Sequence, residues 1–404
     1  MVPALCLLAA LLPARVIHVA PGTAVATVGA ALERAGRGDT IVVHAGLYRE
    51  AGLRVTRPMQ IIGEGAPVID GGGASVFLVS ADSVGIAGLT IRNVAPSFTE
   101  DRAAIRVEGA RGCSIRDNII RDSFFAIYTA RAEDCVIAGN VIVGTGKTET
   151  ANGNAIHLYR SRGMVILRNE VRGHRDGIYL EFGRHATIRG NSSVGNTRYG
   201  LHFMYSDSCA YEGNTFRGNR AGVAVMYSRN VAMTRNTFAG ATGAAAYGLL
   251  LKEITDSRLE QNTFTANTVA LSLEGGERVL ARRNHFVRNG WAVRLRADAD
   301  GGSFEGNEFN GNAFDVVTNS RQAPTRFAGN FWDRYDGYDL DHDGLGDVPF
   351  RPVRLFGLVV EQHPDAILLL NSLLVNLLDL SERVAPILTP ELPVDSTPLI
   401  RRRP

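Results

Sequence analysis

The sequence carries little net charge and contains neither many cysteines nor a long hydrophobic run. Lysine and arginine total 43 and aspartate and glutamate 41, a formal net charge of +2, so we expect no general electrostatic attraction to nucleic acid. The apolar run at 4–12 is too short to span a membrane but has the length of a signal-peptide core. No lysine or arginine precedes it. A signal peptide usually begins with such a charge, but the length of the run still predicts a signal peptide over residues 1–14 and export of the protein, with a hydrophobic N-terminal cap as the alternative.

Asparagine recurs along the chain at intervals of 22 to 29 residues. A fixed period of roughly 20–50 residues indicates a repeat architecture. The repeated residues are Asn118, Asn140, Asn169, Asn191, Asn214, Asn236, Asn262, Asn284, Asn307 and Asn330. Isoleucine stands three residues before several of them and a large apolar residue two after most, in the alternation of a half-buried strand.

These repeats predict an all-β protein, a right-handed parallel β-helix over residues 15–335. A unit of about 22 residues cannot bury its own apolar face, so successive units must stack, with the repeated asparagines forming a hydrogen-bonded ladder. The dense leucines and helical half of a leucine-rich repeat are missing, and a β-propeller blade needs about twice the period. A short helix at 27–35 is expected to cap the N-terminal end.

Three of the four cysteines each precede a repeated asparagine by five residues. Cys113, Cys135 and Cys209 therefore share the inward face, where a thiol packs as a small apolar group. Cys113 and Cys135 fall on neighbouring coils, so a disulfide between them is the alternative.

Aligning the coils at Gly177, Gly200, Gly222 and Gly248 places a group of soft metal ligands on one outward face. Met204 and Met226 are 22 residues apart and so become direct neighbours, and His202 lies two residues before Met204 on the same face. Thioether and imidazole ligands suit copper, in particular Cu(I). The predicted copper ligands are His202, Met204, Met226, His157 and Glu181. An apolar patch, or a protein-binding surface, remains the alternative.

An acidic loop follows the repeats at residues 336–350. Asp339, Asp341, Asp343 and Asp347 occupy positions 1, 3, 5 and 9 of an EF-hand-like loop. Position 12 is Phe350 in place of the required glutamate. A Ca²⁺ site of another type and an acidic turn held by its own hydrogen bonds are both open.

Residues 351–404 form the C-terminal segment, whose centre predicts one apolar helix from Asp365 to Leu380. It is too short to cross a bilayer. Such a helix docks onto a partner or the membrane interface, or packs along the outside of the solenoid. The last residues are proline-rich and are expected to be mobile.

The chain resembles the NosD family along nearly its whole length. The resemblance rests on the segments 153–159, 174–182, 199–206, 222–228, 247–253 and 329–332 together with the acidic loop. It implies a non-enzymatic periplasmic accessory protein that binds or relays copper for the copper centres of nitrous oxide reductase. It further implies work with an ABC transporter made of a permease and an ATPase, with peripheral attachment to the membrane through the permease. Copper would come from a small lipoprotein chaperone and pass to the apo-reductase.

Two other functions remain open on the sequence. A β-helix polysaccharide lyase or epimerase needs a general base with neighbouring cations, and a glycosidase needs paired carboxylates. Glu181, with Glu253 as a possible neighbour, supplies few such groups on the outward columns. A metal-free scaffold that binds the reductase is the third option.

Overall fold

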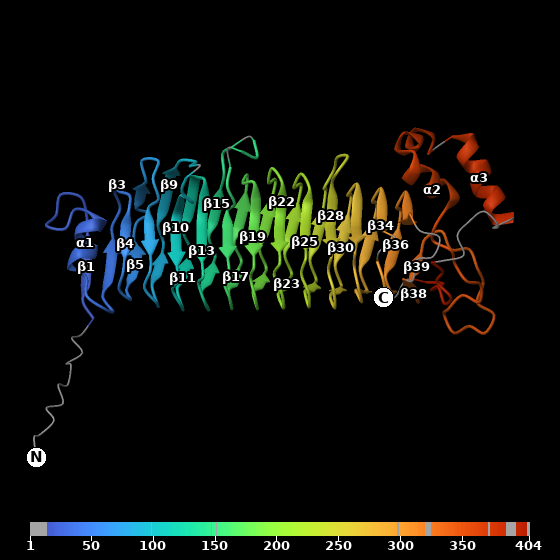
Figure 1. The fold of residues 1–404 in the computed structure, drawn as a ribbon, viewed down its shortest axis with the longest axis horizontal. Coiled ribbons are helices and arrows are strands. Elements are labelled where there is room, and N and C mark those ends of the chain that lie inside the picture. The colour runs from blue at the N-terminus through green and yellow to red at the C-terminus, as the bar shows by residue number, and fades with distance from the viewer. Residues whose placement is uncertain are drawn as a thin grey trace, which may run out of the picture.

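The computed structural model describes residues 14–97, 99–146, 148–150, 152–296, 299–319, 325–370, 372–384 and 393–401. Within them the chain coils into a parallel β-helix with three long sheets, which we name sheets A, B and C (Figure 1). They hold 14, 13 and 12 strands, and neighbouring strands pair in parallel, each with the strand one coil further on. The predicted fold is confirmed. The predicted signal peptide at 1–14 lies almost wholly outside the described residues.

Sheet A consists of β1 (Val16–Val19), β2 (Thr40–Val43), β5 (Gln60–Gly63), β8 (Gly85–Ala87), β11 (Ser114–Arg116), β14 (Val136–Ala138), β17 (Val165–Leu167), β20 (Thr187–Arg189), β23 (Ala210–Glu212), β26 (Ala232–Thr234), β29 (Arg258–Glu260), β32 (Leu280–Arg282), β35 (Ser303–Glu305) and β38 (Arg326–Ala328). Sheet B consists of β3 (Leu47–Arg49), β6 (Val68–Asp70), β9 (Thr90–Val94), β12 (Ile119–Ser123), β15 (Val141–Val143), β18 (Glu170–Arg172), β21 (Ser192–Val194), β24 (Thr215–Arg217), β27 (Thr237–Ala239), β30 (Thr263–Thr265), β33 (His285–Val287), β36 (Glu308–Asn310) and β39 (Phe331–Trp332). Sheet C consists of β4 (Leu53–Val55), β7 (Phe77–Val79), β10 (Ala103–Glu108), β13 (Phe125–Ala130), β16 (Ile156–Tyr159), β19 (Asp176–Glu181), β22 (Tyr199–Met204), β25 (Gly222–Met226), β28 (Tyr247–Lys252), β31 (Val269–Glu274), β34 (Trp291–Leu295) and β37 (Phe314–Thr318).

The core runs along the inside of the coil as columns of identical residue types. Ile115 pairs with Ile137, and this column continues through Ile166 to Ile188. In sheet B a column of phenylalanines ends at Trp332, with successive ring centroids 4.1 to 5.6 Å apart. Stacking thus buries in one continuous core the apolar face that a single coil leaves open.

The repeated asparagines form the predicted ladder at a corner of the coil. From Asn140 onward each Oδ1 accepts from the backbone N–H and the Nδ2 of the asparagine one coil before, as Asn236 does from Asn214 at 3.0 and 2.9 Å. Each Nδ2 also donates to a backbone carbonyl, for Asn214 that of Ile188. The ladder residues are buried. Buried amides are therefore satisfied coil by coil, which fixes the register of the stack.

The cysteines also behave as expected. Cys113, Cys135 and Cys209 are buried and free. The backbone N–H of Cys113 lies 3.2 Å from the sulfur of Cys135. The alternative of a disulfide is therefore not realised, and the thiols pack as core residues.

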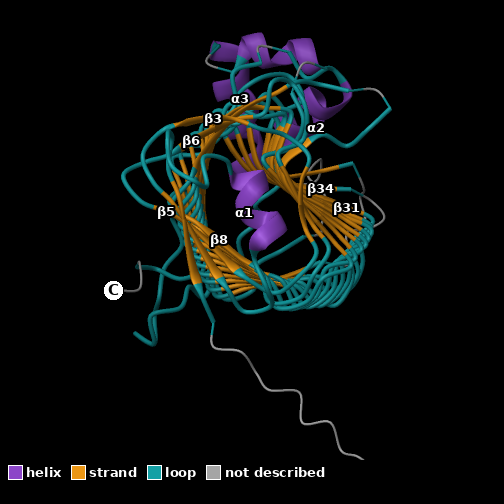
Figure 2. Ribbon diagram, turned by 90° about the vertical axis from the view of Figure 1, so that its left-hand side faces the viewer, coloured by secondary structure: helices purple, strands orange, loops and turns teal. Residues whose placement is uncertain are grey.

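A helix closes the N-terminal end, as predicted. Helix α1 (Val28–Arg34) begins after Thr27, whose hydroxyl accepts from Ala30 N–H. The carboxylate of Glu50 accepts from the N–H groups of Val28 and Gly29 at 2.8 Å each. This negative charge complements the helix N-terminus. Figure 2 shows α1 lying across the end of the coil.

The prediction of a single C-terminal helix is wrong. Helix α2 (Leu355–Gln362), the 3₁₀ helix η1 (Pro364–Leu369) and helix α3 (Leu373–Val384) follow one another in its place. Pro364 lacks the N–H that would continue α2, so the helix stops before it. Phe356 and Val360 of α2 pack on Phe314 and Val317 of the last strand of sheet C. Figure 1 shows these helices gathered at the C-terminal end.

The chain beyond the repeats also completes the solenoid, contrary to the expectation of a mobile tail. Asp395 accepts from the N–H and Nδ2 of Asn330 at 3.0 and 2.9 Å and from Trp332 Nε1 at 3.0 Å. It thereby supplies the acceptor that the next asparagine would have given. The carboxylate is fully buried. Residues 402–404 lie outside the described residues.

Candidate metal-binding face of sheet C

The outer face of sheet C carries the predicted methionine pair in direct register. The Cα of Met204 in β22 pairs with that of Met226 in β25. Glu181 of β19 pairs with Met204 on the other side, and Met226 pairs with Lys252 of β28. The two thioethers and the carboxylate are half-buried. The structure therefore brings Glu181, Met204 and Met226 together on three consecutive strands.

A second column of this face holds the two histidines, and here the expected exposure is wrong. His157 and His202 are 9% and 4% exposed. Tyr179 lies between them, with its ring centroid 4.7 Å from each imidazole. Strand alternation gives the direction of a side chain but does not tell what covers it. His202 lies on the same strand as Met204. His157 lies two strands away from His202, because β19 stands between their strands.

The loop between β15 and β16 contributes to this cover. Asn154 is fully buried, and its Nδ2 lies 3.4 Å from His157 Nδ1. Glu149 forms an ion pair at 3.6 Å with Arg220, which immediately precedes the coil of β25. This ion pair therefore ties the loop to the segment that leads into β25. Its sequence signal is the interval of 29 residues from Asn140 to Asn169, seven more than the usual 22.

Asp176, which no motif in the sequence marks, lies beside His202. Its Oδ2 is 3.6 Å from His202 Nδ1 and 3.7 Å from Arg175 Nε. Its Oδ1 accepts from the N–H of Tyr199 at 3.3 Å. The carboxylate is fully buried. A carboxylate behind an imidazole is the usual way in which proteins orient a metal-binding histidine.

Several buried polar atoms of this cluster lack a hydrogen-bond partner among the described residues. They are both ring nitrogens of His202, His157 Nε2, Asp176 Oδ2 and Asn154 Oδ1. An unsatisfied buried group costs about 1–3 kcal/mol. Such a concentration is uncommon in a structural core and marks places where a ligand would find unused donors and acceptors.

The electrostatic environment keeps His157 neutral. Burial is the main cause that lowers its pKa, to about 3, and nearby Arg175 and His202 lower it further, whereas Asp176 opposes them. Burial likewise raises the pKa of Tyr179, with Glu181 as the next cause. A neutral imidazole keeps the lone pair that a metal ion needs. At neutral pH His157 is thus in the form that can ligate.

An exposed aromatic strip borders the methionine column. Phe182, Tyr205 and Tyr227 directly follow Glu181, Met204 and Met226 and are 43%, 47% and 38% exposed. Their rings stack with centroids 5.3 and 5.0 Å apart. All three residues have φ near +50°, which is unfavourable for an aromatic residue. The chain thus holds an apolar surface beside the thioethers at the expense of backbone strain.

The donor set of this face fits a copper ion. Two thioethers and a carboxylate-backed imidazole on adjacent strands are soft to borderline ligands. Glu181 is a hard ligand within the same column. His157 stands apart from the methionine pair by its position in the register.

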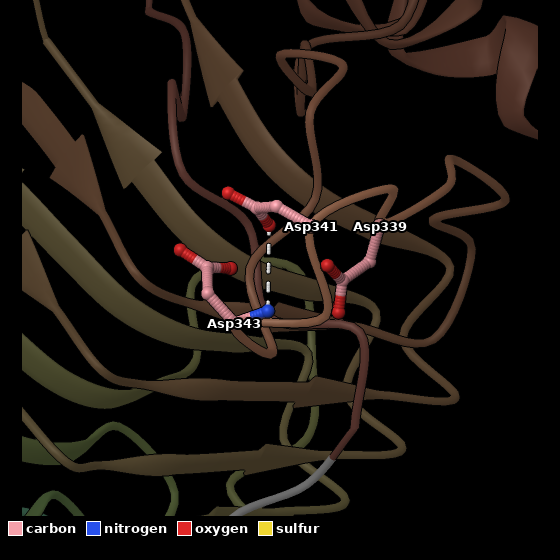
Figure 3. Close-up of side chains that lie close together, drawn as sticks. All are labelled: Asp339, Asp341 and Asp343. Carbon is pink, nitrogen blue, oxygen red and sulfur yellow. Dashed lines mark hydrogen bonds between the residues drawn. The ribbon is translucent and has the colours of Figure 1, made fainter.

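The acidic loop brings together three of the four carboxylates named from the sequence. Asp339, Asp341 and Asp343 each place one carboxylate oxygen within 4.8 Å of the others (Figure 3). Within the described ranges this is the one group of three histidine, cysteine or acidic side chains that is close enough to hold a metal ion. Asp347 is not part of this cluster, and its Oδ2 accepts from Leu340 N–H at 2.7 Å. Asp339 and Asp343 accept from Gly344 and Leu345 N–H at 3.0 and 2.7 Å. The loop is therefore folded by its own hydrogen bonds.

The C-terminal helices leave leucines on the surface. None of the helices described is long and apolar enough to cross a membrane. Leu373, Leu377 and Leu380 of α3 are 75%, 54% and 59% exposed. Their spacing of four and three residues puts them on one helix face.

Residues 142–337 match the family model described as "Periplasmic copper-binding protein (NosD)". Two curated relatives carry the name "Probable ABC transporter binding protein NosD". The one from Pseudomonas aeruginosa is 29% identical, covering 86% of this chain and 85% of the relative. The one from Stutzerimonas stutzeri is 28% identical, covering 88% and 86%.

Solved β-helix structures resemble the chain in fold alone. The surface adhesin PfbA of Streptococcus pneumoniae has a TM-score of 0.52 at 13% identity, over 74% of this chain and 84% of its own. The A-module of the Azotobacter vinelandii mannuronan C-5 epimerase AlgE6 has a TM-score of 0.51 at 17% identity, over 74% and 92%. An adhesin and an enzyme thus share the architecture, so the fold does not select a function.

Proposed function

We propose, from the premise that this chain belongs to the NosD family, that it binds Cu(I) on the outer face of sheet C and relays it during assembly of the copper centres of nitrous oxide reductase. The family is described as periplasmic and copper-binding. Met204 and Met226 supply thioether ligands and His202 supplies an imidazole. Glu181 and His157 flank the site.

The observation that carries this proposal is the registered methionine pair beside a buried histidine that has a carboxylate behind it. Thioethers bind Cu(I) in preference to the harder ions. Half-buried sulfur atoms on a rigid sheet hold a ligand geometry better than sulfur atoms on a loop. Partial exposure also leaves one side open for an incoming or departing ligand, as a relay requires.

The direct test replaces both thioethers without changing side-chain volume. The double variant Met204→Leu/Met226→Leu and the control Met233→Leu are titrated anaerobically with Cu(I) against a chromophoric competitor. Met233 is a fully buried core residue in sheet A, so Met233→Leu removes a thioether that belongs to no proposed site. We expect affinity to fall at least 10-fold in the double variant alone. Unchanged affinity in the double variant refutes the site.

We further propose that α3 docks this chain onto the permease of an ABC transporter, whose ATPase lies on the other side of the membrane. The relatives' name supports a transporter partner. The exposed face of Leu373, Leu377 and Leu380 supports an apolar contact, since isolated exposed leucines are ordinary but an aligned row is not. Attachment would then be peripheral and through the permease.

The test of this docking face must leave Asp395 in place, because a chain truncated before Asp395 would lose the acceptor that ends the asparagine ladder. Leu373→Ser/Leu377→Ser/Leu380→Ser is co-expressed with the permease and ATPase, with Leu47→Ser as control. Leu47 is an exposed leucine of β3 at the opposite end of the solenoid. Loss of co-purification in the triple variant alone is expected, and full retention refutes the docking face.

The remaining partners follow from the family role. A small lipoprotein chaperone would deliver copper and the apo-reductase would receive it. The exposed strip of Phe182, Tyr205 and Tyr227 supports this surface as the place of transfer, because it borders the thioethers and offers an apolar contact.

We also propose that Asp339, Asp341 and Asp343 bind Ca²⁺. Carboxylate oxygens are the ligands that this hard ion prefers. The loop bonds to the returning tail through Gly346 N–H to Pro398 O at 2.7 Å. Bound Ca²⁺ would therefore strengthen the C-terminal closure of the solenoid.

A further inference from the structure

Two histidines meet on the outer surface of sheet A at the N-terminal end of the solenoid. His18 Nδ1 lies 2.9 Å from His44 Nε2, and the two ring planes are 11° apart. His18 belongs to the first strand, β1, and His44 directly follows β2. Within the described ranges this is the one direct imidazole–imidazole hydrogen bond. The methionine pair lies on another sheet, beyond several intervening coils.

A carboxylate stands behind the second imidazole. Glu64 Oε2 lies 3.6 Å from His44 Nδ1, on the side away from His18. The Nδ1–H of His44 can thus stay on the ring and point towards the carboxylate, which leaves the Nε2 lone pair free. The arrangement repeats that of His202 and Asp176, but here the groups are at the surface, with His44 36% and Glu64 59% exposed.

The backbone under His44 is held in place. Its N–H donates to Val19 O at 2.9 Å, as part of the strand pairing. Its carbonyl accepts from the hydroxyl of Tyr48 at 2.8 Å, and Tyr48 is buried. The imidazole therefore projects from a fixed point, which reduces the ordering needed to form a metal site.

We propose that His18 Nδ1 and His44 Nε2 form a second metal site, for a divalent transition-metal ion of which Cu²⁺ is the best match, with Glu64 as the orienting carboxylate. Two nitrogens 2.9 Å apart that each bond an ion at ~2.0–2.1 Å subtend about 90° there. That is the angle between neighbouring ligands of a tetragonal ion, the geometry Cu²⁺ prefers. The exposed rings turn to aim both lone pairs at the ion. Waters or a partner's side chain complete the coordination.

This site is independent of the Cu(I) site of sheet C. Its ligands are nitrogens on exposed side chains, whereas the other site depends on thioethers. The two are therefore separated by testing Cu²⁺ in the full chain that already carries Met204→Leu/Met226→Leu. A negative result for one proposed site then does not count against the other.

The experiment is a Cu²⁺ titration of that double variant followed by electron paramagnetic resonance. We expect one tetragonal ion per chain with two equatorial imidazole nitrogens. Adding His44→Gln should remove one nitrogen from the spectrum and lower affinity at least 10-fold, and His18→Gln should do the same. The matched control is His285→Gln, since His285 pairs with Glu308 at 3.0 Å without a second imidazole. A spectrum and affinity unchanged by both His18→Gln and His44→Gln overturn the proposal.

Discussion

Replacing Asp176 with asparagine should weaken copper binding although Asp176 itself is not a ligand. In the wild type Asp176 Oδ2 faces His202 Nδ1 at 3.6 Å, which favours a proton on Nδ1 and a free lone pair on Nε2. Asparagine keeps the volume and can still accept from Tyr199 N–H through Oδ1, a contact of 3.3 Å. The side-chain Nδ2 of the asparagine, however, donates towards the imidazole of His202. The proton then moves to Nε2, and this nitrogen no longer ligates.

The size of the effect follows from charge and distance. Two unit charges 3.6 Å apart interact by about 4–5 kcal/mol at an effective dielectric constant of about 20, and the partial charge of an imidazole N–H takes only a fraction of that energy. Arg175, 3.7 Å from the same oxygen, already offsets part of that field. Loss of an outer carboxylate costs about 10- to 100-fold in metal affinity in other sites. We expect a loss in that range, or about 1.4–2.7 kcal/mol.

The assay is the anaerobic Cu(I) competition titration of Asp176→Asn. Asp256→Asn is the matched control, because it makes the same chemical change in an exposed aspartate paired with Arg278. Circular dichroism and thermal unfolding establish that both variants fold. Affinity equal to wild type in a folded Asp176→Asn protein would refute the role of this carboxylate. An equal loss in the control would show that the effect is nonspecific.

Three further results are expected. Asn214→Ala removes the acceptor of two donors of the preceding ladder residue and the donor to a strand carbonyl. At about 1–3 kcal/mol for each of these three groups, it should lower the free energy of unfolding by about 3–9 kcal/mol in urea denaturation, whereas exposed Arg217→Ala should change it by less than about 0.5 kcal/mol. Burial lowers the pKa of His157 to about 3 and that of His174 to about 4. Because both folded pKa values lie below the unfolded one, the stability that the two histidines contribute is complete above pH ~6.5 and is lost as the pH falls, by about 3 kcal/mol for each at pH 4. A thermal stability that stays constant between pH 7 and 4 would contradict this. Ca²⁺ at ten times its Kd should stabilise the chain by about 1.4 kcal/mol in thermal unfolding, and Asp343→Asn should abolish the gain; equal gains in both proteins would place the ion elsewhere.

The sequence predicted the fold and the register because both follow from its period. A spacing of 22 residues is enough to place Met204 beside Met226, and the structure confirms it. Alternation also gave the correct inward columns of isoleucine and phenylalanine. These features depend on local spacing, which a single sequence displays.

What the sequence did not predict depends on contacts between distant segments. The burial of His157 comes from neighbouring rings and from Asn154, on a loop whose course has no local pattern. Asp176 approaches His202 only because two strand starts align. Asp395 ends the asparagine ladder from 65 residues beyond Asn330. No periodicity links such residues, so the sequence alone does not predict that the tail packs against the last coil.

X-ray absorption of the Cu(I)-loaded chain tests the central claim most directly. The account predicts a first shell that contains both sulfur and nitrogen, with the sulfur lost in Met204→Leu/Met226→Leu and kept in Met233→Leu. A shell of nitrogen and oxygen alone in the wild type, or sulfur that persists in the double variant, would contradict copper binding at the methionine pair.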